Sequence, residues 1–274
     1  MKKSVYPKLT PFIDLGFVRL GGPGLANCMI ITARAYILAK KNNYNYISPT
    51  WSKISLGPYF RNEPDKRHYF GLFKKHGITG IKKIYYILLS IINNKNVIKI
   101  NDLGNYFQDL RENRDTVINY FNNIINTKIP NIKNTIGIHI RLGDYKGTTS
   151  ETNLDYYLKI INIIEKMYSD RYNFNIFSDA TNGELNKILN NTSVKKVFFG
   201  NALSDMIALS RCDLIIGSDS TFSAMAAFLN NTPIIFPKRH FGSIHNNPSK
   251  ELVFGDFKDD NILINFLHTL LLKK

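Results

Sequence analysis

A short segment near the middle of the chain carries residues well suited to bind an anion. Residues 135–145 read TIGIHIRLGDY, in which β-branched residues precede a Gly-Asp pair, and this predicts a buried strand running into a tight turn. Because side chains alternate along a strand, His139 and Arg141 share one face near its carboxyl end. Ligands of open α/β sheets bind at that end, and a guanidinium matches the geometry of phosphate. A surface ion pair is the alternative explanation for Arg141.

Two further segments place polar side chains where predicted strands end. Residues 214–217 read as a strand, and the loop that follows opens a helix with hydroxyl and aromatic side chains, Ser220, Thr221, Phe222 and Ser223. Hydroxyls and free N–H groups at a helix start can bind an anion, although plain N-capping would also explain them. Asp179 follows the predicted strand 174–177 and could accept hydrogen bonds from a base or a ribose; helix capping is its alternative.

A glycine-rich turn lies near the N-terminus. Residues 12–20 are predicted to form a strand and residues 25–41 a helix, with Gly-Gly-Pro-Gly between them. This order brings a helix N-terminus to an anion, so Gly22 and Gly24 are candidate donor-binding residues. The third position of the G-x-G-x-x-G pattern is Asn27, which makes the pattern weak, and a tight turn that needs glycine explains it equally well.

The composition limits the classes of function. The chain has 274 residues and a net charge of +15, an excess that favours anionic partners. Its two cysteines, Cys28 and Cys212, stand far apart outside any metal-binding spacing, so neither a disulfide framework nor a zinc site is predicted. The N-terminus lacks a signal-peptide pattern, and the longest apolar stretch, residues 84–92, is too short to span a bilayer. We therefore expect a cytoplasmic protein, with peripheral contact at an anionic membrane face left open.

The remaining pattern predicts an α/β protein with a doubly wound parallel sheet. Strands are expected at 44–48, 97–100, 174–177, 197–199, 214–217 and 233–236, and helices at 81–93, 110–125, 154–168, 184–189 and 203–211. Residues 127–134 are polar and contain a proline, which places a boundary between domains 1–130 and 131–274. The carboxyl ends of the strands should gather Arg141, Asp179 and residues 218–223 at one edge.

Residues 49–77 form a long irregular segment in which aromatic and basic side chains alternate. Trp51 and Tyr59 are its candidate acceptor-binding residues, because aromatic faces beside cations suit sugars, bases or lipid headgroups. Packing of the loop on its own domain is the alternative. No Asp-x-Asp pair occurs in the chain, so no metal is expected and Arg141 is the natural group to neutralise a leaving diphosphate.

Taken together, these segments resemble the α-1,2-fucosyltransferases. Residues 139–145 (HIRLGDY) resemble the family's HxRRGDY motif, and residues 176–179 (IFSD) resemble its FSDD strand end. Residues 205–223, with Asp-Met, then Ser-Arg-Cys, then Ser-Thr-Phe-Ser, are similar to its D-x-x-x-M-S-x-C…NSTFSWWAA region. The glycine turn is similar to its G-x-L-G-N-Q segment. The chain departs from these motifs where Leu142 replaces the second Arg, Asp219 replaces Asn, Cys28 replaces Gln, and Ala224 and Met225 replace Trp-Trp.

The resemblance implies a GT-B architecture, in which two Rossmann-like domains face a cleft. It implies GDP-fucose as the donor substrate, held by the C-terminal domain, and an oligosaccharide acceptor held by the N-terminal one. Transfer would invert the fucose carbon without a cofactor or metal. By the motif match, Arg141 would contact the diphosphate, His139 the nucleotide and Asp179 the guanine, while Ser220, Thr221, Phe222 and Ser223 would contact the phosphates or the base.

The resemblance also implies a proton acceptor for the attacking hydroxyl. In related core α-1,6-fucosyltransferases a glutamate shortly after the arginine motif has that role, and Glu151 falls near this place when a gap is allowed; Asp144 is the other nearby carboxylate. The expected function is fucosyl transfer in surface polysaccharide synthesis, with a lipid-linked acceptor left open. Two alternatives remain: a GT-B transferase for another nucleotide sugar, and a non-enzymatic basic nucleic-acid-binding protein, which the ordered motifs disfavour.

Overall fold

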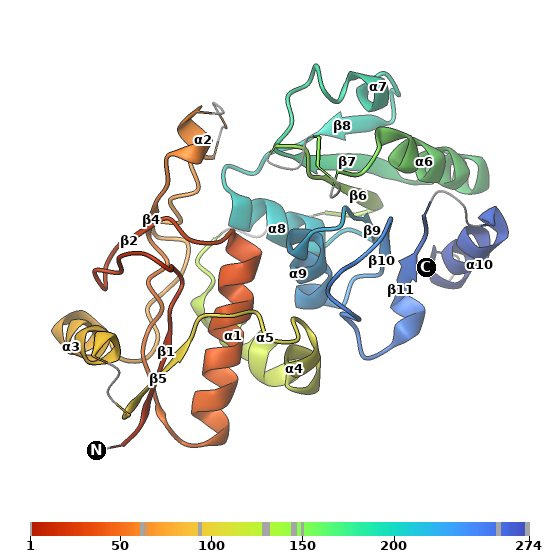
Figure 1. Ribbon diagram of the computed structural model, residues 1–274. Coiled ribbons are helices and arrows are strands. Elements are labelled where there is room, and N and C mark those ends of the chain that lie inside the picture. Colours follow the sequence, from red (N-terminus) through yellow and green to blue (C-terminus); the bar gives the residue numbers. More distant parts are fainter. Residues whose placement is uncertain are drawn as a thin grey trace. The chain divides into compact units, whose positions relative to one another are not determined.

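The computed structural model describes residues 2–60, 63, 65–92, 95–127, 132–143, 147–148, 151–255 and 259–271 (Figure 1). The chain divides into two compact units, Met1–Lys128 and Ile129–Lys274. The sequence prediction placed the domain boundary between residues 130 and 131.

The second unit is built on a six-stranded sheet whose strands are all parallel. The strands are β6 (Thr135–Ile140), β7 (Asn173–Ser178), β8 (Val194–Lys196), β9 (Leu214–Ile216), β10 (Ile234–Phe236) and β11 (Glu251–Val253). Their order is β8-β7-β6-β9-β10-β11, so the chain first builds outward from β6 on one side and then returns to build on the other. The predicted doubly wound parallel sheet is confirmed, and its switch point lies between β6 and β9.

Helices cover both faces of this sheet (Figure 1). The isoleucines of β6 share one apolar core with α6 (Leu154–Tyr168), α7 (Asn186–Leu189) and α10 (Asp260–Leu271). On the opposite face, α8 (Ala202–Ser210) and α9 (Thr221–Asn230) pack beside each other. Gly137 permits this close approach, because a Cβ there would come within 2.6 Å of the Leu209 side chain. The strand β6 is buried along its whole length, which fixes the direction of His139.

The first unit contains a smaller parallel sheet in the order β3-β1-β5. Its strands are β1 (Ser4–Pro7), β3 (Asn45–Tyr46) and β5 (Val97–Ile100), and a second pair is formed by β2 (Arg19–Leu20) and β4 (Lys53–Ile54). The helices of this unit are α1 (Leu25–Lys41), α2 (Gly57–Phe60), α3 (Gly80–Ile91), α4 (Gln108–Glu112) and α5 (Arg114–Ile124). The helix α1 packs on β1 and β5 and buries most of its apolar residues.

Several predicted elements differ from the observed ones. The first strand is β1 and not residues 12–20, because Phe12 and Phe17 point into solvent and only Arg19–Leu20 pairs with another strand. The helix predicted at 110–125 is two helices that meet at Asn113. The strand predicted at residues 197–199 is observed three residues earlier, as β8. The strand β11 and the helix α10 were not predicted. The helix at 25–41 and the strand at 97–100 are confirmed to the residue.

Among the described residues, no helix combines the length and the apolar character needed to cross a bilayer.

Candidate functional site

His139 lies at the switch point of the six-stranded sheet, near the carboxyl end of β6. Its Nδ1 is 2.7 Å from Ser223 Oγ and 3.1 Å from Ser218 Oγ, and its ring stacks on Phe222 with 4.8 Å between the ring centroids. Burial, followed by the neighbouring charge of Arg141, lowers the pKa of His139 to about 3. The imidazole is therefore neutral at physiological pH, and it offers a polar, uncharged group rather than a cation.

Arg141 and Asp179 form an ion pair across the ends of β6 and β7. Arg141 Nη1 lies 2.9 Å from Asp179 Oδ2. The other carboxylate oxygen of Asp179 accepts hydrogen bonds from the backbone N–H groups of Leu142 (3.1 Å) and Gly143 (3.2 Å). One carboxylate therefore holds both the guanidinium and the turn that follows the strand.

The charge state of Asp179 follows from these contacts. Burial by itself raises the pKa of this carboxyl, but Arg141 and the N–H groups of Leu142 and Gly143 outweigh it, so the pKa lies below its usual value. Only glycine at position 143 lets the Asp179 carboxylate lie this close to the turn, because a Cβ there would be 2.5 Å from Asp179 Oδ2. The ion pair predicted as the alternative explanation for Arg141 is thus present, yet it lies at the predicted ligand-binding edge.

The start of α9 faces the same edge. Ser220 is the N-cap residue, and its Oγ accepts a hydrogen bond from the N–H of Phe222. Capping, the alternative explanation, therefore accounts for Ser220, whereas Ser223 turns its hydroxyl to His139. Thr221 begins the helix and is partly exposed. The N-terminus of a ten-residue helix places backbone N–H groups and a partial positive charge at this edge.

The predicted donor-binding glycines belong to the first unit. Gly22 adopts a positive φ of 98°, and a Cβ there would collide with Leu9 O and with Arg19 Nη1, so close packing explains this glycine. Arg19 is fully buried and donates to the carbonyls of Thr50 and Gly21. Gly24 is the N-cap residue of α1, and a Cβ there would meet open space. Of the two, Gly24 is the one that has room beside it for a ligand.

The two predicted acceptor-binding residues differ in their surroundings. Trp51 is buried and stacks on Phe73 with 3.8 Å between the ring centroids, as the packing alternative expects. Tyr59 is half exposed; its hydroxyl lies 2.8 Å from His68 Nε2, and the Lys66 ammonium lies 5.2 Å from the centre of its ring. Of the two, Tyr59 is therefore the one whose ring is open to a ligand.

The predicted proton acceptors are only partly described by the structure. Asp144 lies outside the described residues. Glu151 is exposed, and its carboxylate accepts a hydrogen bond of 2.6 Å from the N–H of Gly147, within its own loop. No group of three His, Cys, Asp or Glu side chains in the described part of the chain is placed to hold a metal ion.

Sequence reasoning placed Ser218 at this edge and missed two other residues there, Tyr157 and His240. Ser218 follows β9 directly and bonds to His139, and Tyr157 from α6 donates to the His139 carbonyl at 3.3 Å. The ring nitrogen Nδ1 of His240 donates to Asp219 Oδ1 at 2.8 Å, and the same oxygen accepts a hydrogen bond from the backbone N–H of His240. The position of Ser218 at a strand end was the signal that placed it here, whereas nothing in the local sequence links residues 219 and 240.

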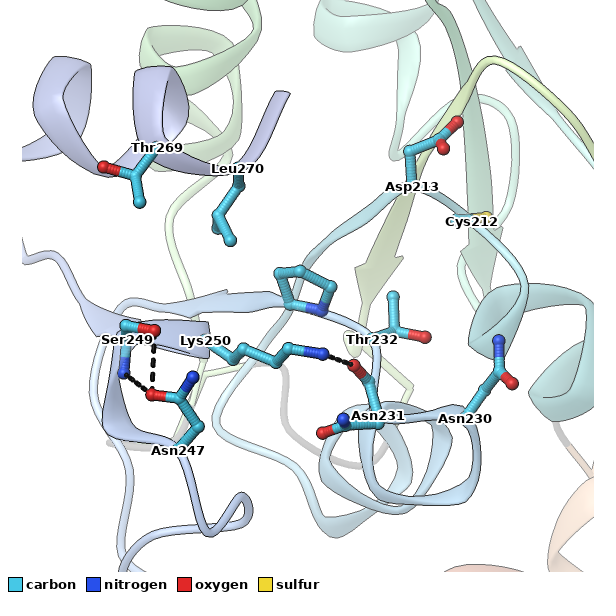
Figure 2. A pocket seen from close by; sticks show the side chains of 11 residues that line it. Cys212, Asp213, Asn230, Asn231, Thr232, Asn247, Ser249, Lys250, Thr269 and Leu270 are labelled. Carbon is cyan, nitrogen blue, oxygen red and sulfur yellow. Dashed lines mark hydrogen bonds between the residues drawn. The ribbon is translucent and has the colours of Figure 1, made fainter. Parts of the chain in front are cut away.

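A pocket of about 430 Å³ opens near the other edge of the same sheet, where the amino ends of β9 and β10 lie (Figure 2). Some of its polar groups pair with one another: Lys250 Nζ donates to the Asn231 carbonyl at 3.0 Å, and Ser249 donates to the Asn247 side chain. The pocket contains none of the candidate site residues, although Cys212 of the motif region lines it.

Known proteins that resemble the chain agree with this fold. Fucosyltransferase NodZ from Bradyrhizobium superposes with a TM-score of 0.50 at 15% sequence identity, covering 85% of this chain and 94% of that one. A second structure, described as NodZ α-1,6-fucosyltransferase soaked with GDP-fucose, gives a TM-score of 0.49 at 14% identity over the same shares of the two chains. At such low identity the first similarity shows a shared fold. None of the curated protein sequences matches this chain.

The family model for glycosyl transferase family 11 matches residues 86–237, which is more than half of the chain. The matched region runs from α3 to the end of β10, so it includes His139, Arg141, Asp179 and the start of α9. These are the residues that carried the resemblance in the sequence. The chain belongs to glycosyl transferase family 11.

Proposed function

We propose that this protein transfers L-fucose from GDP-fucose to a hydroxyl of an oligosaccharide acceptor, forming an α-1,2 linkage with inversion and without a metal. One observation carries the proposal: His139, Arg141, Asp179 and the start of α9 meet at the switch point of a doubly wound sheet in a family 11 chain. The choice of fucose rests on the family motifs and accords with NodZ, a fucosyltransferase of the same fold.

The donor diphosphate would bind beside a guanidinium that is already oriented. Asp179 holds Arg141 in place, so the arginine needs no rearrangement when the donor arrives. As the acceptor oxygen attacks the fucose carbon, the bond to the diphosphate breaks and negative charge grows on the leaving group. Arg141 and the N–H groups at the start of α9 would stabilise this charge, which is the role a metal plays in other glycosyltransferases.

The nucleotide would lie against the neutral, buried side of the site. His139 is uncharged and stacked on Phe222, and two serine hydroxyls hold its Nδ1. Such a group favours a hydrogen bond to a ribose or base and adds no charge repulsion or attraction. Asp179 would reach guanine through the carboxylate that also receives Arg141, Leu142 and Gly143.

The acceptor hydroxyl must lose a proton as it attacks. Asp144 and Glu151 are the proposed acceptors of that proton by position in the motif. His240 is a third candidate, because a neutral imidazole that donates its Nδ1–H to Asp219 presents Nε2 as its basic nitrogen.

The acceptor would bind to unit Met1–Lys128 and the donor to unit Ile129–Lys274, as the GT-B architecture implies. Tyr59 and the aromatic segment around it would contact the acceptor sugar, with Trp51 supporting the segment from within. We place the reaction in the cytoplasm, in the synthesis of a surface polysaccharide on a lipid-linked acceptor.

The experiment that tests the proposal offers the purified protein a panel of nucleotide sugars, with and without excess EDTA. We expect slow hydrolysis of GDP-fucose alone, transfer to a β-galactoside acceptor, and equal rates in EDTA. Hydrolysis of a different nucleotide sugar would support the alternative donor, which the changes at Leu142, Asp219, Ala224 and Met225 leave open. Loss of activity in EDTA that Mg²⁺ restores would contradict the metal-independent mechanism.

Binding measurements separate the enzyme from a basic nucleic-acid-binding protein. GDP bound at a defined site should keep most of its affinity when the salt concentration is raised several-fold, whereas non-specific RNA binding falls steeply over such a range. Tight, salt-sensitive RNA binding without GDP binding would contradict the proposed function.

A further inference from the structure

The helix α3 exposes an apolar face in addition to the one that it buries. Its buried face carries Lys83, Tyr86, Ile87 and Ser90, whereas Ile81 is 86% exposed, Leu88 58% and Ile91 68%. Burial lowers the pKa of Lys83 to about 8. A helix on a protein surface usually directs its charged residues outward and its isoleucines inward. The exposed isoleucine and leucine side chains indicate that something apolar covers the outer face of α3.

A neighbouring loop continues the apolar surface. Gly16 lies directly on α3, because a Cβ there would be 3.0 Å from the Ile84 side chain. The loop also exposes large apolar side chains, and its single acid, Asp14, turns inward to Tyr6 and Thr50. We call the combined face the α3 apolar surface; it consists of Phe12, Ile13, Leu15, Phe17, Ile81, Tyr85, Leu88, Ile91 and Ile92. Monomeric proteins rarely expose so many large apolar residues in one place.

The positive charge of the protein is concentrated in the same part of the chain. Residues 1–100 contain 17 Lys and Arg against 3 Asp and Glu, a net charge of +14, whereas residues 101–274 contain 19 against 18. One of these cations, Lys82, adjoins the α3 apolar surface, because it is exposed on α3 itself. The occupant must therefore accept apolar side chains and carry negative charge.

Two other common partners of an exposed apolar surface do not both accept apolar side chains and carry negative charge. A second copy of the chain would bring a second strongly positive unit to the interface, and like charges oppose that contact. Nucleic acid supplies negative charge but no apolar layer to bury isoleucine and phenylalanine. The headgroup and acyl boundary of an anionic bilayer supplies both, and helices with an apolar face and flanking lysines bind there in the plane of the membrane.

We propose that the α3 apolar surface docks this protein on the surface of an anionic lipid bilayer, with α3 lying in the interface plane. The apolar side chains enter the acyl boundary, while Lys82 and the other exposed cations of residues 1–100 attract the headgroups. The proposal does not depend on the donor or acceptor, although it would bring a transferase to a lipid-linked acceptor.

Vesicle flotation with the full chain tests this proposal. We expect binding to vesicles of phosphatidylcholine with about one third phosphatidylglycerol, and much less binding to pure phosphatidylcholine. The double variant Ile81→Gln/Leu88→Gln removes two exposed side chains and keeps good helix formers, so it should fold normally and bind at least about tenfold less tightly, a conservative estimate for two buried apolar side chains. Raising NaCl from about 0.1 to about 0.5 M should also weaken binding, because screening reduces the headgroup attraction.

A matched control uses an apolar residue exposed on a helix of the other unit. Ile262 in α10 is 45% exposed, and Ile262→Gln should bind vesicles as the unchanged protein does. Circular dichroism and the melting temperature verify folding of each variant. Failure of the unchanged protein to float with anionic vesicles, or equal binding by the double variant, would overturn the proposal. So would a dimer in solution that only the double variant separates, since that result assigns the surface to a second copy.

Flotation is independent of catalysis. Activity on a soluble acceptor should be the same for the double variant and the unchanged protein, because α3 carries none of the candidate site residues. A protein that binds vesicles but hydrolyses no nucleotide sugar would contradict the proposed function and leave the docking surface intact.

Discussion

The guanidinium of Arg141 and the carboxylate of Asp179 join the ends of two neighbouring strands, 2.9 Å apart. The same carboxylate accepts the N–H groups of Leu142 and Gly143, so the turn after β6 and the arginine are held by one group. Arg141 is partly exposed, with about a fifth of its side chain open to solvent. It is therefore positioned by the protein and still accessible to a ligand.

Arg141→Ala should lower kcat by about 10²–10³, the usual cost of removing one group that stabilises a developing negative charge. Asp179 keeps two backbone donors in this variant, so the protein should remain folded. Arg141→Lys should also be badly impaired, because the ammonium keeps the charge but loses the planar fork that Asp179 orients. The measurements are kcat, GDP affinity and melting temperature. Near-normal kcat for Arg141→Ala would show that the ion pair is only structural.

Gly143→Ala should reduce activity more than it reduces stability. The added Cβ would lie 2.5 Å from Asp179 Oδ2, so the carboxylate must move and the orientation of Arg141 is lost. Gly183 is a matched control on the loop after β7, where the nearest atom to an added Cβ is 3.9 Å away. We expect Gly183→Ala to keep full activity in a transfer assay. Equal activity of Gly143→Ala and Gly183→Ala would show that transfer does not require Asp179 to orient Arg141.

His139 should make stability depend on pH. Its pKa is about 3 in the folded protein, whereas an unperturbed histidine has a pKa of 6.5, so between these values the unfolded chain binds more protons and stability rises with pH. The contribution is complete above about pH 6.5 and is lost as the pH falls, by up to about 1.4 kcal/mol per pH unit. Urea unfolding at about pH 7.5 and about pH 5 should therefore show a smaller difference for His139→Asn than for the unchanged protein.

The exposed His268 of α10 provides the control for this measurement. His268→Asn should keep the pH dependence of the unchanged protein. If His139→Asn also keeps it, His139 is not the group that titrates.

Glu151→Gln should lower kcat by about 10²–10⁴ and leave GDP affinity nearly unchanged, because a general base acts on the acceptor proton and not on the donor. His240→Gln should retain activity within about tenfold. The reverse ranking of the two variants would assign the proton to His240.

Trp51 and Tyr59 should respond in opposite ways to truncation. Trp51 is buried and stacked on Phe73, so Trp51→Ala should lower the free energy of unfolding by about 3–5 kcal/mol. Tyr59 is half exposed, so Tyr59→Ala should leave the melting temperature unchanged and raise the acceptor KM. An unchanged acceptor KM for Tyr59→Ala, measured with saturating donor, would show that Tyr59 does not bind the acceptor.

Much of the second unit could be predicted from the sequence alone, because local patterns determine it. The alternation around His139 and Arg141, the helix at 154–168 and the hydroxyls before α9 each reflect a periodicity or an end signal that short segments carry by themselves. The family motifs occur in the same order along this chain. The prediction that these segments lie at one edge of the sheet followed from the expectation that its strands are parallel.

Only the tertiary structure decided which partner each side chain has. The pairing of Asp179 with Arg141 joins two residues far apart in the chain, and the contact of Asp219 with His240 depends on how the loop after β10 folds back. The same holds for Trp51, whose aromatic character suits both a sugar site and a core until its contact with Phe73 is known. The exposed apolar face of α3 also needed the structure, because an apolar sequence does not reveal which side of a helix packs on the protein and which side is exposed. Local sequence sets the propensity and the spacing of residues, whereas long-range packing selects their contacts.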